Sequence, residues 1–80
     1  MTLDALPPRA RARITAVDWD ALAPEEATRL QALGIDAGAE VEIAHRGVFA
    51  GKDPIALGIG RMTVALRRAH ARAMQVEQLA

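Results

Sequence analysis

The chain has 80 residues, a length that forms one small domain and buries only about 60–65% of the surface exposed in the unfolded state. Ten basic and ten acidic residues give a formal net charge of zero, so no long-range field attracts nucleic acid or acidic lipid. Cysteine is absent, which excludes disulfides and thiolate metal sites. We expect a single domain over residues 1–80 with an aliphatic core, because only Trp19 and Phe49 are aromatic.

The N-terminal residues lack the features of a targeting segment. Met1-Thr2-Leu3-Asp4 contains no basic residue, and no apolar run follows it, so we expect no signal peptide. The sequence contains nothing near 18 consecutive apolar residues, so we expect no direct membrane insertion. These features favour a cytoplasmic location.

The first regular element follows a lead-in over residues 3–8 that ends at Pro7-Pro8. From Arg9, arginines at alternate positions are separated by small or apolar residues until about Val17. A period of two predicts a half-buried strand.

A helix is expected over about residues 24–33. Pro24 suits the first helical position, and Glu25 and Glu26 place negative charge at the positive end of the helix dipole. Gly34 is the expected left-handed residue that ends the helix, with Ile35 folding back onto Leu30.

The second half of the sequence consists of short strands and turns. Apolar residues alternate with polar or small ones around 41–43, at 55–59, at 62–66 and at 74–77, and these segments are predicted to be strands. Residues 46–54 are expected to form a loop, Gly60-Arg61 a tight turn, and residues 67–72 a short helical turn. About five short strands and one clear helix predict a mainly β fold, a small barrel.

Catalysis is disfavoured by the residue inventory. The chain has no Ser, Cys, Tyr or Asn, and no Thr lies beside a histidine in the sequence. Lys52, the only lysine, lies in the 46–54 loop, where a solvated charge is expected. We therefore expect a binding protein rather than an enzyme, with no catalytic residue and no cofactor.

Two histidines are weak candidates for a transition-metal site. His45 would lie on the apolar face of the strand that contains Val41 and Ile43, and His70 would lie in the late helical turn. No paired-ligand spacing such as H-x-x-x-H is present. The alternative is one histidine at a strand end and one exposed on a helix, and we expect at most weak metal binding.

Nucleic-acid binding is the third alternative. Arginines at 9, 11 and 13 and at 67, 68 and 72 are able to form a basic surface. Barrels that bind nucleic acids usually place aromatic side chains among the basic ones for base stacking, and none is near here. We therefore expect no nucleic-acid partner and interpret both groups as solvated surfaces.

The 46–54 loop is the most interesting predicted surface. Val48 and Phe49 are apolar residues between Gly47 and Gly51. They either cover one end of the barrel or anchor a protein partner, since interfaces are enriched in aromatic residues.

The motif Arg29-Leu30-Gln31-Ala32-Leu33-Gly34-Ile35-Asp36-Ala37-Gly38 resembles the R-L-x-x-L-G-hydrophobic-x-P-G signature of FeoA-like proteins. Asp53-Pro54-Ile55, the segment 64–71, Val76-Glu77 and the opening residues 3–8 resemble the family's other elements in order and spacing. The sequence departs from the family pattern at Arg9, where glycine is usual, at Ala37, where proline is usual, and at His70, where an acid is common.

The resemblance implies an SH3-like barrel and a cytoplasmic accessory protein of ferrous iron uptake that contacts the transporter FeoB. The candidate partner-binding residues are Leu33, Val48, Phe49, Lys52, Asp53 and Pro54. It also implies the alternative of a transition-metal-responsive module related to the C-terminal domain of iron-dependent repressors.

Overall fold

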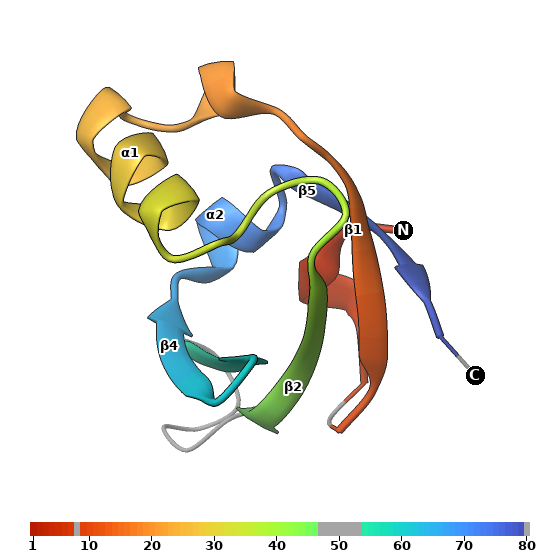
Figure 1. Cartoon of the computed structure of the whole chain (residues 1–80). Coiled ribbons are helices and arrows are strands. Elements are labelled where there is room, and N and C mark those ends of the chain that lie inside the picture. The colour runs from red at the N-terminus through yellow and green to blue at the C-terminus, as the bar shows by residue number, and fades with distance from the viewer. Residues whose placement is uncertain (8, 47–53, 80) are drawn as a thin grey trace.

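Five antiparallel strands form a single curved sheet in the computed structural model, which describes residues 1–7, 9–46 and 54–79, without the side chains of 45 and 46 (Figure 1). The strands are β1 (Arg11–Val17), β2 (Glu40–Arg46), β3 (Ile55–Ile59), β4 (Met62–Leu66) and β5 (Met74–Gln78). Their order in the sheet is β4-β3-β2-β1-β5. The prediction of a mainly β fold with five short strands is confirmed.

The core is aliphatic, as the composition predicted. Alternate side chains of the strands point inward, for example Ala12 and Ile14 on β1 and Val41 and Ile43 on β2, and all four are buried. No polar or charged residue of the described ranges is buried in this core. The ionisable side chains of the described ranges therefore lie on the rim and the outer surface.

The helix α1 (Pro24–Ala32) begins at Pro24 as predicted and ends one residue before the predicted Leu33, which is its C-cap. Gly34 adopts a φ of 89°, which favours glycine because it has no Cβ. The Ile35 N–H donates to the Leu30 carbonyl at 2.9 Å, and the Gly34 N–H donates to the Gln31 carbonyl at 3.0 Å. These two bonds define a Schellman motif, and Leu30 and Ile35 are both fully buried.

The remaining predicted elements also form. β3 and β4 are joined by the Gly60-Arg61 turn, with Ile59 opposite Met62 and Ile55 opposite Leu66. The helical turn predicted at 67–72 is α2 (Arg68–Ala71), and it connects β4 to β5, the two strands at the ends of the sheet order. Of the predicted 46–54 loop, Arg46 instead belongs to β2, because it pairs with Ile55, and residues 47–53 lie outside the described residues.

The N-terminal lead-in is more ordered than predicted. Leu3–Ala5 form a 3-10 helix, η1, and both Leu3 and Leu6 are fully buried in the core. Met1 and Thr2 lie along β5, where the Val76 N–H donates to the Met1 carbonyl at 2.8 Å and Thr2 bridges Gln75. Asp4 forms an ion pair with Arg72 at 3.6 Å, which connects η1 to the residue after α2.

A second difference concerns the start of the first strand. The prediction began at Arg9, but β1 begins at Arg11, because Arg9 lies in a turn with a φ of 66°. The Arg9 N–H donates to the Ile43 carbonyl at 2.8 Å, which holds the backbone in this left-handed conformation. A side chain at such a φ costs about 1–2 kcal/mol relative to glycine. The later segment Trp19–Ala21 forms another 3-10 helix, η2.

Replacing Arg9 with glycine is expected to stabilise the protein. Glycine relieves the left-handed strain in the folded protein, but its greater entropy in the unfolded chain opposes folding. The free energy of unfolding should therefore rise by about 0.5–1 kcal/mol. Urea denaturation of wild type, Arg9→Gly and Arg9→Ala measures it. Arg9→Ala keeps the Cβ and should not gain stability, so an equal gain in both variants would show that the arginine side chain, not the backbone, is the cause.

Candidate functional site

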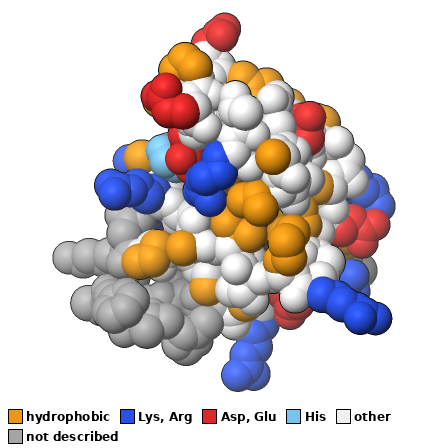
Figure 2. All heavy atoms as spheres, turned by 60° about the vertical axis from the view of Figure 1, so that its left-hand side comes forward, with side chains coloured by type: hydrophobic (Ala, Val, Ile, Leu, Met, Phe, Trp, Pro, Cys, Tyr) orange, Lys and Arg blue, Asp and Glu red, His pale blue; other side chains and the backbone are white. Residues whose placement is uncertain are grey.

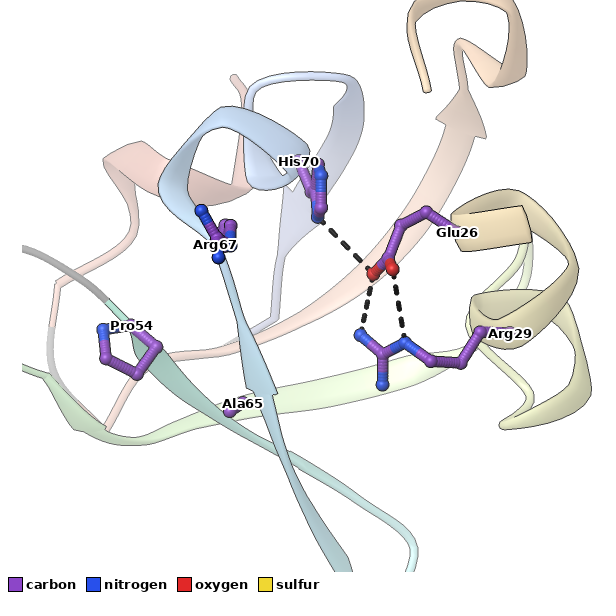
Figure 3. Close-up of a pocket in the computed structure, with 6 residues that line it drawn as sticks. All are labelled: Glu26, Arg29, Pro54, Ala65, Arg67 and His70. Atoms are coloured by element: carbon purple, nitrogen blue, oxygen red, sulfur yellow. Dashed lines mark hydrogen bonds and ion pairs between the residues drawn. The ribbon is translucent and has the colours of Figure 1, made fainter. Parts of the chain in front are cut away.

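A surface cavity lies where α1, α2 and the β3–β4 hairpin meet (Figure 3). Its volume is about 400 Å³. Glu26 and Arg29 line it from α1, and Ala65 and His70 line it from β4 and α2. The other two lining residues are Pro54, directly before β3, and Arg67, directly before α2. Four of these six side chains are ionisable, so the cavity is a polar site beside an aliphatic core.

Glu26 and Arg29 form a two-point ion pair on α1. The Arg29 Nε donates to Glu26 Oε1 at 3.3 Å, and Nη2 donates to Oε2 at 2.6 Å. Residues three apart lie on the same face of a helix, which allows this fork geometry. The hydrogen bond from Arg29 holds the pKa of Glu26 below its usual value, although partial burial of the carboxylate acts in the opposite direction.

His70 links this ion pair to α2. Its Nδ1 atom lies 3.4 Å from Glu26 Oε2, and the side chain is 23% exposed. Nδ1 itself is buried and makes no hydrogen bond within the described part of the chain. The 3.4 Å approach is therefore an ion pair only when His70 is protonated, and the Glu26 carboxylate lies between two basic side chains from different helices (Figure 3).

The structure brings together two of the residues predicted from the sequence. Pro54, an expected partner contact, and His70, an expected weak metal ligand, line the same cavity. Four lining residues were not predicted: Glu26, Arg29, Ala65 and Arg67. The i, i+3 spacing of Glu26 and Arg29 was a signal for their ion pair, whereas nothing local in the sequence places α2 beside α1.

The other predicted site residues are not part of this cavity or are not described. Leu33 is partly buried against the core at the end of α1. The backbone of His45 belongs to β2 and pairs with Ala56, but its side chain lies outside the description. The remaining predicted contacts, Val48, Phe49, Lys52 and Asp53, fall within residues 47–53, which the structure does not describe.

Beyond the end of α1, apolar side chains reach the surface. Met62 is 46% exposed and pairs with Ile59, which is partly buried. A Cβ added to Gly34 would lie 3.7 Å from Ile59 Cδ1, so the end of α1 packs against the β3–β4 hairpin. On this side of the molecule hydrophobic side chains gather next to acidic, basic and histidine side chains (Figure 2). We call Leu33, Ile59 and Met62 the apolar patch.

The side chains that the structure describes do not assemble a metal centre. No group of three or more His, Cys, Asp or Glu side chains within the described ranges is placed to hold a metal ion. The closest approach to one is His70 with Glu26, and both Glu26 oxygens already accept hydrogen bonds from Arg29. Metal ions are usually held by three or four protein ligands, so this pair is incomplete.

The arginines of β1 are paired with carboxylates. Arg11 and Arg13 both lie 3.6 Å from Glu40 on β2, and Arg13 also lies 3.6 Å from Glu77 on β5. These exposed ion pairs cross three neighbouring strands and balance the positive charge of the strand face. They agree with the interpretation of β1 as a solvated strand face.

A five-stranded barrel-like sheet with one well-formed helix and a polar cavity at the helix junction defines a small, mainly β domain. Comparison with known proteins identifies which one. The sequence model of the FeoA domain matches residues 1–78, and the chain belongs to this family. No curated protein matches the sequence. No helix in the described ranges is long and apolar enough to cross a membrane.

Solved structures agree with this assignment. The FeoA protein from Chlorobium tepidum is 32% identical with a TM-score of 0.85, and the match covers 100% of this chain and 71% of that protein. The FeoA of Stenotrophomonas maltophilia, described as an SH3 domain protein and solved with zinc, is 32% identical with a TM-score of 0.76 over 96% of this chain and 89% of that one. T. acidophilum IdeR shares the fold, with a TM-score of 0.79 at 19% identity. The match covers 98% of this chain and 33% of the IdeR chain. The SH3-like fold is thereby confirmed.

The Glu26–Arg29 pair predicts a component of stability that is lost in acid. The pKa of Glu26 is lower in the folded than in the unfolded protein, so the pair stabilises the fold above the unfolded pKa of about 4.3 and ceases to do so as the pH falls through the folded pKa. Because the pair is partly solvated, we expect less than about 1 kcal/mol.

Urea denaturation of wild type and Glu26→Gln at pH 6 and at pH 3 measures this component. The wild type should lose more stability between these values than the variant. Glu25→Gln, a substitution on the same helical turn outside the cavity, is the matched control. An identical loss in wild type and Glu26→Gln would show that the carboxylate is not stabilised by Arg29.

Proposed function

We propose that this protein is a cytoplasmic accessory component of ferrous iron uptake that binds the cytoplasmic region of the FeoB transporter and catalyses no reaction. The observation that supports this most directly is the FeoA domain match over residues 1–78, together with FeoA structures at 32% identity. The sequence agrees with a binding role, since it contains no Ser, Cys or Tyr nucleophile.

The apolar patch and the neighbouring cavity rim are the proposed contact surface. Met62 is one of two large hydrophobic residues exposed in the described ranges, and Leu33 lies at the end of the helix that packs beside Ile59. Interfaces combine an apolar centre with a polar rim, and this side of the molecule offers both (Figure 2). Pro54 is exposed at the cavity, and Val48, Phe49, Lys52 and Asp53 precede it in the chain, so we propose that they extend the same surface.

Binding of the purified cytoplasmic region of FeoB, measured by calorimetry, tests this function. We expect saturable binding by the wild type. Met62→Ala, Leu33→Ala and Phe49→Ala should each weaken it by about 5- to 30-fold, which corresponds to about 1–2 kcal/mol for an interface contact. Leu30→Ala is unsuitable, because Leu30 is fully buried and its truncation would cost about 2–5 kcal/mol of folding stability.

Gln78→Ala is the control for these variants. Gln78 is exposed on β5, at the other end of the sheet order from β4, so its truncation should leave the affinity unchanged. Absence of binding by the folded wild type would overturn the proposed function. Wild-type affinity in all three patch variants would leave the function standing but show that another surface makes the contact.

A further inference from the structure

The cavity at the α1–α2 junction has an excess of positive charge. Its lining contains two arginines and one histidine but a single carboxylate, Glu26, whose two oxygens already accept hydrogen bonds from Arg29. Even with a neutral His70, the described lining residues therefore carry one positive charge in excess. A cavity with this balance attracts an anion.

Both arginines have donors left for such an anion. Arg29 uses Nε and Nη2 toward Glu26, and its Nη1 makes no hydrogen bond to any described residue. Arg67 is exposed, and no ion pair or hydrogen bond joins its side chain to the described part of the chain. The two side chains enter from opposite sides of the cavity, Arg29 from α1 and Arg67 from the residue before α2 (Figure 3). Guanidinium groups match the planar geometry of a carboxylate.

The other walls favour an anion on a carbon stem. Pro54 and Ala65 both line the cavity and are exposed, and they are the apolar part of its lining. The methylene groups of a glutamate or aspartate side chain can pack on such surfaces while the carboxylate reaches the arginines. An inorganic ion has no group to make these contacts.

His70 and Glu26 have a different role in this arrangement. His70 Nδ1 lies 3.4 Å from Glu26 Oε2, so the histidine contacts the carboxylate that orients Arg29. Glu26 therefore fixes one edge of the Arg29 guanidinium toward α1. The opposite edge, with Nη1, points away from Glu26 (Figure 3).

We propose that this cavity binds an acidic side chain of a protein partner, its carboxylate held between Arg29 and Arg67 and its methylene groups packed on Pro54 and Ala65. The inference rests on the proposed function only for the identity of the partner, a segment of the transporter with an exposed glutamate or aspartate. The recognition chemistry belongs to the cavity itself.

An NMR titration of the full ¹⁵N-labelled chain tests the site directly. The probe is an N-acetylated tetraglutamate amide, with the tetraglutamine peptide as the neutral match and inorganic phosphate as the free-anion match. We expect shift changes centred on α1 and residues 65–70 with tetraglutamate only. Arg67→Gln should weaken this binding about tenfold, the loss expected for one charge-assisted hydrogen bond.

Arg11→Gln is the matched control, because it removes the same charge from an exposed site on β1. It should weaken binding by less than about twofold. Arg67→Lys keeps the charge without the fork and should restore only part of the affinity. Spectra of each variant without peptide verify that α2 is intact.

Three results would overturn the inference: no shift change with tetraglutamate, equal weakening by Arg11→Gln and Arg67→Gln, or phosphate binding as tightly as the peptide. The calorimetric assay with the transporter region separates the two proposals. Tetraglutamate binding at the cavity without any binding of the transporter region supports the inference and overturns the proposed function. Transporter binding unchanged by Arg67→Gln supports the proposed function and overturns the inference.

Discussion

The aliphatic core determines where every other part of this small protein lies. A chain of 80 residues has one core, and the burial of apolar area at about 25 cal/mol per Å² is its main source of stability. The inward residues of the five strands supply most of that core. Leu30 and Ile35 position α1 on it, Leu3 and Leu6 position the N-terminal segment, and Ala71 positions α2.

This arrangement explains why the polar residues of interest occur at a helix junction. The described core holds no polar or charged residue, so the ionisable groups of the described ranges lie outside it. His70 meets the Glu26–Arg29 pair only because α1 and α2 are both held against the core. The resulting site is partly exposed, and its one carboxylate, Glu26, is paired with Arg29 and approached by His70.

Much of the fold follows from local sequence patterns, namely apolar alternation in the strands and the residues that begin and end the helix. Alternation defined the strands at 55–59 and 62–66 to the residue, and Pro24 and Gly34 marked the helix because each suits one special backbone position. Two features depended on longer-range contacts instead. Burial of Leu3 and Leu6 has no periodic signal, and the left-handed Arg9 is held by the Ile43 carbonyl.

The candidate site was predictable only in part, for the same reason. His70 and Pro54 were singled out individually from the sequence, but 44 residues separate Glu26 from His70. Their contact depends on how two helices pack on a shared core, which no local pattern encodes. The Glu26–Arg29 pair could have been predicted from the sequence, since opposite charges at i and i+3 interact wherever the helix forms.

The pairing of Met1 and Thr2 with β5 affects how the protein can be handled and assembled. β5 lies at one end of the sheet order, and an uncovered strand of this kind offers unpaired N–H and C=O groups to any other extended chain. The Met1 carbonyl and the Thr2 bridge occupy part of that edge. A fusion tag at the N-terminus that pulled these two residues away would open a site for strand addition and self-association, whereas a tag after β5 would leave this cover in place.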